Sequence, residues 1–150
     1  TPVFMASTKG DDSIVQVLAD GKANINEPTN YGTTPVYMAS QKGHNSVVQI
    51  LVDAKANFNQ PRIDGVTPVS MASHKGHNSV VQVLVDAKAN TNQPTNDGVT
   101  PVSLASHEGH NSVVQVLVDA KANINQPRND GATPASLASY EGYNSVVQVL

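Results

Sequence analysis

The sequence predicts an all-α repeat protein, a solenoid of helix-turn-helix units linked by β-hairpin-like loops. Three observations carry this prediction. A Thr-Pro pair recurs every 33 residues, two short apolar segments follow each pair, and a turn-rich segment closes each unit. A fixed period of this length is typical of stacked repeats, in which each unit buries its apolar face only against its neighbours. The pairs begin at Thr1, Thr34, Thr67, Thr100 and Thr133.

These pairs divide residues 1–150 into a single array. Its units are 1–33, 34–66, 67–99, 100–132 and a partial 133–150. Because the chain begins and ends inside the motif, we expect it to be a fragment of a longer array. Units 67–99 and 100–132 differ at only five positions, which are Met71/Leu104, Lys75/Glu108, Thr91/Ile124, Thr95/Arg128 and Val99/Ala132.

The opening of each unit predicts a short helix. Threonine is a favourable N-cap, and proline fits the first helical position because its missing N–H costs nothing there. In the fourth unit Ala105 and Ser106 permit close approach of a neighbouring helix. Gly109 should then end the helix after about two turns.

The second segment of each unit, VVQVLV at 113–118, is ambiguous on its own. Valine favours strands, and a short apolar run cannot be assigned by periodicity. Its context favours a helix, because the apolar residues fall on one side and an S-x-x-Q capping-box pattern precedes them. The predicted capping pairs are Ser46/Gln49, Ser79/Gln82, Ser112/Gln115 and Ser145/Gln148. The segment 125–132, NQPRNDGA, has the composition of a turn and predicts a hairpin-like loop.

Composition excludes several classes of protein. The formal net charge of −3 gives no basic face for nucleic acid and no attraction to an anionic membrane. The absence of cysteine excludes disulfides and thiolate metal sites. No apolar run approaches the roughly 18 residues of a membrane helix, and no signal peptide is visible. We expect an intracellular, cytoplasmic protein.

No enzyme active site is predicted. An active site needs unlike residues that converge on one pocket, whereas the serines here are repetitive and the carboxylates of Asp53, Asp86 and Asp119 form a solvated ladder. There is no glycine-rich phosphate loop. We therefore predict no catalytic residues and no cofactor.

The histidines predict no metal site. In three units one histidine follows a glycine, and residues so spaced cannot converge on one ion. We expect these residues, His44, His77 and His110, to bond nearby backbone between helices. His74 and His107, at the ends of the first helices, are expected to be exposed polar residues or partner contacts.

The pattern D-G-x-T-P-V-x-x-A-S-x-x-G-H-x-x-V-V-x-x-L-V-x-x-x-A-x-x-N resembles the ankyrin repeat. The resemblance covers essentially the whole chain. It implies a β-turn and two antiparallel helices per repeat, a curved stack, and reversible protein–protein recognition without catalysis. The matching residues in the fourth unit are Asp97, Gly98, Thr100, Pro101, Ala105, Gly109, His110, Val113, Val114, Leu117, Ala122 and Asn125.

The chain departs from the family pattern at two places. Family members usually carry a histidine that braces the first helix, where this chain has Phe4, Tyr37, Ser70, Ser103 and Ser136. Those hydrogen bonds must be lost in part or remade by serine. Lys22, Lys55, Lys88 and Lys121 stand where a left-handed glycine is usual. Either these lysines adopt the left-handed conformation at about 1 kcal/mol each, or the helix continues and Asn57, Asn90 or Asn123 adopts it.

The resemblance implies that turn tips and first helices line a concave face that binds the partner. Along the first helices, Lys9, Lys42 and Lys75 give way to Glu108 and Glu141, and Tyr31, Tyr37 and Tyr140 are aromatic candidates, Tyr37 being the one expected to be partly buried. The predicted partner-binding residues are Lys9, Tyr31, Thr33, Gln41, Lys42, Asp64, Val66, His74, Lys75, Asn96, Asp97, Val99, His107, Glu108, Asn129, Asp130, Tyr140 and Glu141.

Two functions remain open at this point. The first is a module that binds a protein or peptide on the concave face. The alternative is a structural spacer or scaffold segment of a long array, which the near-identity of the units favours. Val147, Val149 and Leu150 end the chain with an apolar helix face, so we expect a monomer with frayed ends or end-to-end association.

Overall fold

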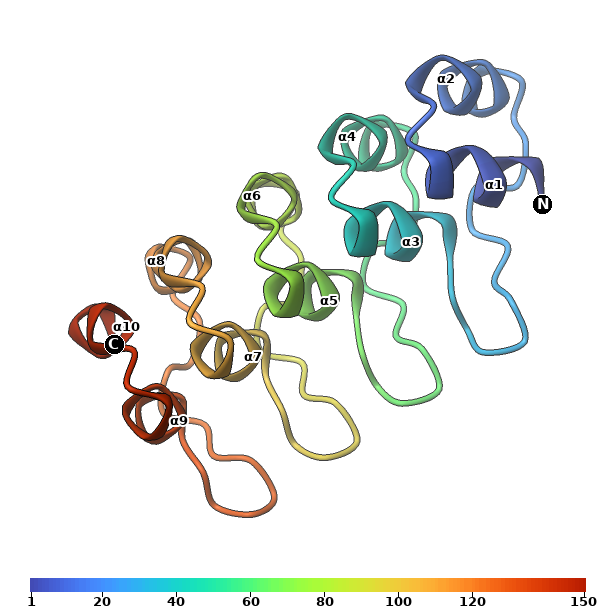
Figure 1. The fold of residues 1–150 in the computed structure, drawn as a ribbon. Helices are drawn as coiled ribbons and strands as arrows, with labels where there is room; N and C mark the ends of the chain where they lie inside the picture. The colour runs from blue at the N-terminus through green and yellow to red at the C-terminus, as the bar shows by residue number, and fades with distance from the viewer.

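The structure is a computed structural model that describes all residues 1–150, and it contains ten α-helices in five pairs and no strand. The pairs repeat along the chain as a stack, which confirms the predicted all-α repeat architecture (Figure 1). The helices are α1 (Pro2–Lys9), α2 (Asp12–Asp20), α3 (Pro35–Lys42), α4 (Asn45–Asp53), α5 (Pro68–Lys75), α6 (Asn78–Asp86), α7 (Pro101–His107), α8 (Asn111–Asp119), α9 (Pro134–Glu141) and α10 (Asn144–Val149).

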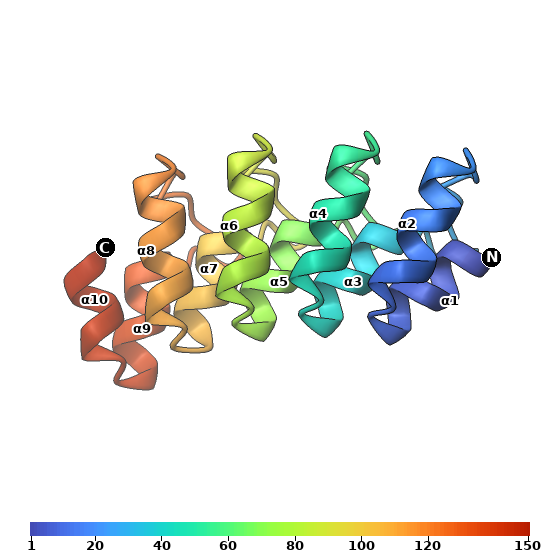
Figure 2. The ribbon, with the colours of Figure 1, turned by 90° about the horizontal axis from the view of Figure 1, so that it is seen from above.

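The helices form two layers, with the odd-numbered helices in one and the even-numbered helices in the other (Figure 1). Within each layer every helix packs against the next one, and each pair also packs internally. The even-numbered helices lie side by side in a row (Figure 2), and the loops between pairs project away from the odd-numbered layer. The two termini lie at opposite ends of the stack (Figure 1).

The odd-numbered helices begin and end as the sequence predicts. The Oγ1 atoms of the threonine N-caps accept hydrogen bonds from the backbone three residues later, as Thr67 does from the N–H of Ser70 at 3.2 Å. Proline follows each cap, and a left-handed glycine ends four of the five helices directly. In α7 the C-cap is Glu108, and Gly109 adopts the left-handed conformation one residue later.

The predicted capping boxes of the even-numbered helices are wrong. Helices α4, α6, α8 and α10 begin two residues earlier than these boxes require, so that His44, His77, His110 and Tyr143 are the N-caps and no side chain caps the helix. The glutamine side chains point towards the C-terminal end of the helix and do not bond back to its N-cap. Gln82 Nε2, for example, donates to Asp86 at 2.9 Å, and the pairs Gln49–Asp53 and Gln115–Asp119 repeat this bond.

The core is a continuous stripe of small and β-branched side chains between the two layers. Val69 and Ala72 of α5 meet Val81 and Leu84 of α6, all with no exposed surface. Equivalent residues of neighbouring repeats extend the same cluster along the stack. The ambiguous valine-rich segments are therefore helices, because stacking buries their apolar side and offsets the low helix propensity of valine.

A lysine adopts the left-handed conformation after each of the first four even-numbered helices. Lys22, Lys55, Lys88 and Lys121 have φ angles of 59°, 66°, 68° and 62°. This outcome selects the first of the two alternatives, because no asparagine has a positive φ. Asparagines instead join consecutive repeats just beyond these turns. The Oδ1 atoms of Asn26, Asn59 and Asn92 accept from the backbone N–H of Asn57, Asn90 and Asn123 at 2.7, 2.9 and 2.7 Å.

Serine takes over the bracing position of the first helices. Ser70 and Ser103 are buried, and their hydroxyls lie 2.8 and 2.9 Å from the hydroxyls of their N-cap threonines. Ser136 donates instead to the backbone carbonyl of Thr133 and accepts from its N–H, both at 2.9 Å. Serine therefore bonds the N-cap threonine in these three repeats, whereas the first two repeats, with Phe4 and Tyr37, have no such serine.

Candidate partner-binding surface

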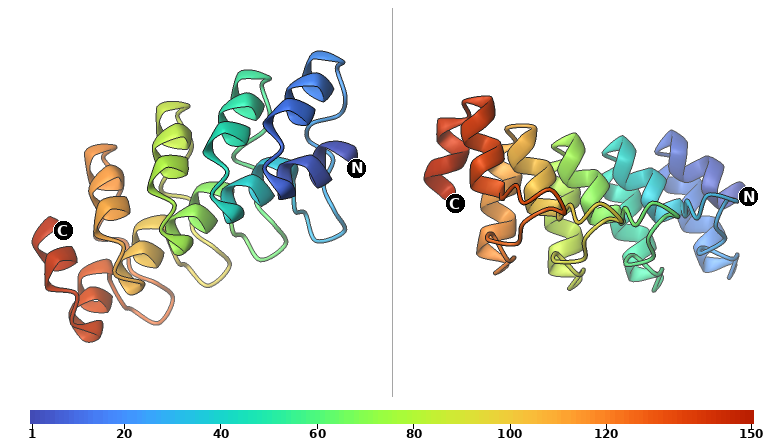
Figure 3. Two further views of the ribbon diagram at one scale, coloured as in Figure 1. Left: turned by 45° about the horizontal axis from the view of Figure 1, so that its top comes forward. Right: turned by 90° about the horizontal axis from the view of Figure 1, so that it is seen from below.

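The loops between repeats are hairpins that pair with one another. In the loop after α4 the N–H of Arg62 donates to Val66 O at 3.0 Å, which closes the hairpin, and the same bond recurs in every loop. Neighbouring hairpins are joined by backbone bonds such as Asn96 N–H to Asp64 O at 3.1 Å. Seen from below, the hairpins run along one side of the stack (Figure 3). We call the hairpins 29–33, 62–66, 95–99 and 128–132, together with the exposed side of the odd-numbered helices, the groove surface.

The charged residue at the end of each odd-numbered helix changes sign along the stack. Lys9, Lys42 and Lys75 occupy the same position at the ends of α1, α3 and α5, and all three are exposed. Glu108 and Glu141 occupy that position after α7 and at the end of α9, and they are exposed as well. The structure thus places these five predicted residues in one row.

Two histidines lie within the acidic part of this row. His107 Nδ1 lies 3.1 Å from Glu108 Oε1, and its Nε2 lies 3.8 Å from Glu141 Oε1. His74 Nδ1 lies 3.7 Å from the same Glu108 oxygen. These side chains are each more than a third exposed, so solvent screens the contacts.

The tyrosines on this surface divide into exposed and buried. Tyr31 is 64% and Tyr140 is 89% exposed, whereas Tyr37 is only 1% exposed. The Tyr37 ring lies under the Arg62 guanidinium, 5.6 Å from its centre, and the Tyr37 hydroxyl accepts from Arg62 Nη1 at 3.5 Å. Burial raises the pKa of the Tyr37 phenol above 10.0, against the opposing effect of Arg62. Tyr37 is therefore more deeply buried than expected, and its role is in packing.

Some predicted contact residues are already engaged inside the stack. Asn96 Nδ2 donates to Ile63 O at 3.0 Å, and Asn129 Nδ2 donates to Asn96 O at 3.2 Å. Thr33 is buried. The backbone carbonyl of Gln41 accepts from His77 Nε2 at 3.0 Å. The Gln41 side chain is half-buried at the surface.

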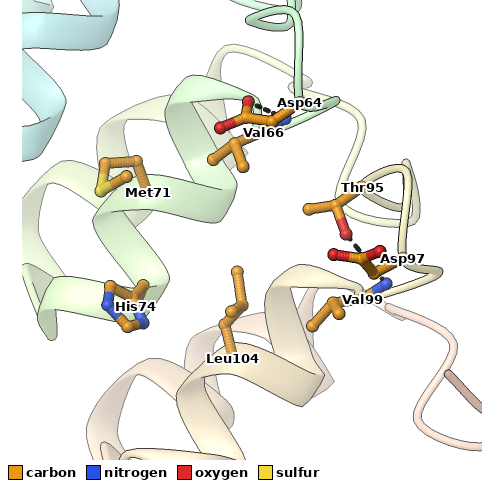
Figure 4. Close-up of a pocket in the computed structure, with 8 residues that line it drawn as sticks. All are labelled: Asp64, Val66, Met71, His74, Thr95, Asp97, Val99 and Leu104. Carbon is orange, nitrogen blue, oxygen red and sulfur yellow. Dashed lines mark hydrogen bonds between the residues drawn. The ribbon is translucent and has the colours of Figure 1, made fainter. Parts of the chain in front are cut away.

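One mainly apolar pocket opens on the groove surface, between the third and fourth repeats. It has a volume of about 280 Å³. The side chains of Met71 and His74 from α5, Leu104 from α7 and hairpin residues on both sides surround it (Figure 4). Five of the predicted contact residues line this pocket, and its full lining is Asp64, Val66, Met71, His74, Thr95, Asp97, Val99 and Leu104.

The two carboxylates of this pocket have different environments. Asp64 Oδ1 accepts from the N–H of Val66 at 3.1 Å, and its Oδ2 lies 3.4 Å from Arg62 Nη2. In the next hairpin the residue equivalent to Arg62 is Thr95, whose Oγ1 accepts from the N–H of Val99 at 3.1 Å. The Asp97 carboxylate is left without a hydrogen bond or an ion pair within the chain (Figure 4).

The histidines of the recurring Gly-His turn hold adjacent repeats together. His44, His77 and His110 donate from Nε2 to a backbone carbonyl of the preceding repeat, at 3.3, 3.0 and 3.0 Å. The predicted backbone role of these residues is therefore confirmed. No group of three or more His, Asp or Glu side chains is arranged to hold a metal ion.

Sequence reasoning missed two features of this surface. The inter-repeat asparagine bonds were not foreseen, although Asn recurs at fixed positions in every unit. The isolation of Asp97 was also missed, although Thr95 had been identified as a difference between near-identical units. The signal was present in the alternation of threonine and arginine at positions 29, 62, 95 and 128.

Comparison with known proteins agrees with the observed repeat. A family model described as ankyrin repeats (3 copies) matches residues 1–62 and 69–150. A comparison with curated proteins gives no match. No helix combines the length and the apolar character that crossing a membrane requires. Because the family model covers almost the whole chain and the structure repeats the paired helices and hairpins, this chain belongs to the ankyrin-repeat family.

Proposed function

We propose that the chain binds a protein or peptide along the groove surface and catalyses no reaction. Ankyrin repeats are generally protein–protein interaction modules and are generally not enzymes. The proposal rests on the positions at which the repeats differ from one another. The exposed faces of α4, α6 and α8 carry the same Gln–Asp pair each time, whereas the groove surface carries residues that change from repeat to repeat.

A recognition site needs unlike residues, because identical repeats offer a partner the same contacts at every register. The groove surface supplies that difference through its change of charge and through exposed Tyr31 and Tyr140. Tyrosine provides a large contact area at low entropic cost and is enriched among the residues that dominate binding energy. We further propose that the partner lies across several repeats, with its acidic segments towards Lys9 and Lys42.

A display library of random peptides tests this proposal. The intact chain is the bait, alongside a groove variant in which Tyr31, Lys42, Lys75 and Tyr140 are all changed to alanine. The control variant changes the same number of exposed residues on the even-numbered helices, Gln16, Gln49, Gln82 and Gln115, to alanine. We expect saturable peptide ligands that the groove variant loses and the control variant keeps.

The second candidate function is a spacer segment with no partner of its own. The regular asparagine and histidine bonds between repeats favour it, because they make a uniform stack of fixed rise. Failure to select any saturable ligand, or ligands that bind both variants equally, would support the spacer and count against the groove site.

A further inference from the structure

We infer that the pocket between the third and fourth repeats receives a long cationic side chain of the partner, arginine in preference to lysine. This inference rests on the proposed function and specifies what the partner carries. Its basis is the contrast between Asp97 and the equivalent aspartates of the neighbouring hairpins.

The chain itself shows what an aspartate at this position binds. Arg62 pairs with Asp64 at 3.4 Å, and Arg128 pairs with Asp130 at 3.2 Å. In both hairpins the arginine stands two residues before the aspartate, and the aspartate also accepts the backbone N–H two residues later. Thr95 replaces the arginine in the hairpin between them and takes over the backbone bond to Val99. Asp97 thus keeps the charge of its counterparts but lacks both of their partners.

The surroundings of Asp97 suit the rest of a long side chain. The pocket beside it is floored by Met71, Leu104, Val66 and Val99, which can cover the methylene stem of an arginine or lysine (Figure 4). A volume of about 280 Å³ lies at the lower limit of small-molecule sites and matches one inserted side chain better than a drug-sized ligand. No equivalent pocket forms at the other hairpin junctions.

The charges around the pocket favour a cation. Asp64 forms its second wall, and the positive charge of Arg62 is already matched by that carboxylate and directed over the Tyr37 ring. Asp97 therefore contributes an unmatched negative charge. A guanidinium can bond both oxygens of one carboxylate and is less strongly hydrated than an ammonium, so arginine should bind more tightly than lysine.

The three methionines of the chain provide a direct test. With their methyl groups labelled with carbon-13, the intact protein gives one NMR reporter in the pocket, Met71, and two outside it, Met5 and Met38. The probes are the N-acetyl, N-methylamide derivatives of arginine, lysine and citrulline. Citrulline has nearly the shape of arginine and no charge. We expect a saturable shift of the Met71 signal with arginine, a weaker response with lysine, and affinity for citrulline reduced roughly fivefold, the limit for a partly exposed ion pair.

Three variants complete the test. Thr95→Arg supplies an internal partner to Asp97 and should abolish the Met71 response, and Asp97→Asn should reduce it to the citrulline level. Thr29→Arg is the matched control, because it adds the same charge to a hairpin that has Tyr31 in place of an aspartate. It should leave the response unchanged.

An equal response to citrulline, an unchanged response in Asp97→Asn, or no Met71 shift would overturn the inference. The peptide library separates this failure from failure of the proposed function. Library ligands that need the groove but carry no required arginine would support the function and refute the cationic pocket. A Met71 response to arginine with no library ligand would support the pocket and refute the binding module.

Discussion

Residues 67–99 and 133–150 carry the same motif, yet the same side chains lie in different surroundings. Val81 in α6 has no exposed surface, whereas Val147, its equivalent in α10, is 37% exposed. A Cβ on Gly76 would lie 2.7 Å from the His110 ring, whereas a Cβ on Gly142 would meet nothing within 4 Å. The comparison teaches that part of the burial of each repeat comes from the following repeat, although Ala138 and Val146 of the last repeat are buried without one. The contribution of a side chain therefore depends on its neighbour as much as on its own unit.

The largest effect should come from a core leucine. We expect Leu84→Ala to lower the free energy of unfolding by about 3 kcal/mol, because Leu84 is fully buried and its loss leaves a cavity. The equivalent change Leu150→Ala, at a half-buried position, should cost about 1 kcal/mol. Urea unfolding followed by circular dichroism measures both. Equal costs would refute the dependence on the following repeat.

The glycines after the first helices give a sharper version of the same comparison. Both Gly76 and Gly142 are left-handed, so alanine at either position costs about 1 kcal/mol of backbone strain. Gly76→Ala should cost about 1 kcal/mol more, because the His110 ring must move and its bond to His74 O weakens. The difference in unfolding free energy between the two variants measures the cost of the contact between residue 76 and the His110 ring. A difference of zero would show that the ring moves without cost.

Replacing a left-handed lysine with glycine should increase stability, in contrast to the substitutions above. We expect Lys88→Gly to stabilise the fold by roughly 0.5–1 kcal/mol, because glycine adopts a φ of 68° without strain. The control is Lys75→Gly, within the last turn of α5, which should destabilise by about the same amount. Thermal unfolding of the two variants should shift in opposite directions, and a loss of stability in both would contradict the strain argument.

The smallest effect concerns the phenol of Tyr37. The folded pKa of Tyr37 is raised above 10.0 by burial, so the unfolded chain loses this proton first as the pH rises. Its contribution is complete below about pH 10 and is lost as the pH increases through the folded pKa. Tyr37→Phe should lower the free energy of unfolding by about 0.5–1 kcal/mol at neutral pH, because the bond from Arg62 is lost. Above pH 10 the free energy of unfolding of this variant should fall less steeply with pH than that of the unchanged protein. The same dependence of stability on pH above 10 in the two proteins would contradict a raised pKa for the buried Tyr37 phenol.

Most of the fold could be predicted because its determinants are local and repeated. Thr-Pro caps and left-handed glycines act within one unit and recur with the period of the chain, so the sequence predicts two helices per unit and the bounds of the first. The second-helix start could not be predicted in the same way. Ser79 and Gln82 have the spacing of a capping box, but His77 bonds the preceding repeat and is the N-cap, two residues earlier. A contact between repeats thus overrode a pattern within one.

The candidate site was predictable only in outline. The charges of Lys75 and Glu108 identify exposed residues without any structure, and their row on one face follows from the repeat. The pocket beside Asp97 depends on how two hairpins and two helices meet, and on the competition between Thr95 and Asp97 for one backbone N–H. Such competition is decided in three dimensions, and it explains why a five-position difference between near-identical units can carry chemical meaning.

The asparagine bonds between repeats have a consequence for how such a chain can change in length. Each joint uses the same two groups, an Oδ1 in one repeat and a backbone N–H 31 residues later, as from Asn59 to Asn90. Removing or duplicating a complete unit brings an equivalent acceptor opposite an equivalent donor, so the new joint is as good as the old one. An insertion or deletion within a helix between the two groups shifts the acceptor relative to the donor. The array can therefore gain or lose complete repeats without losing these bonds between repeats.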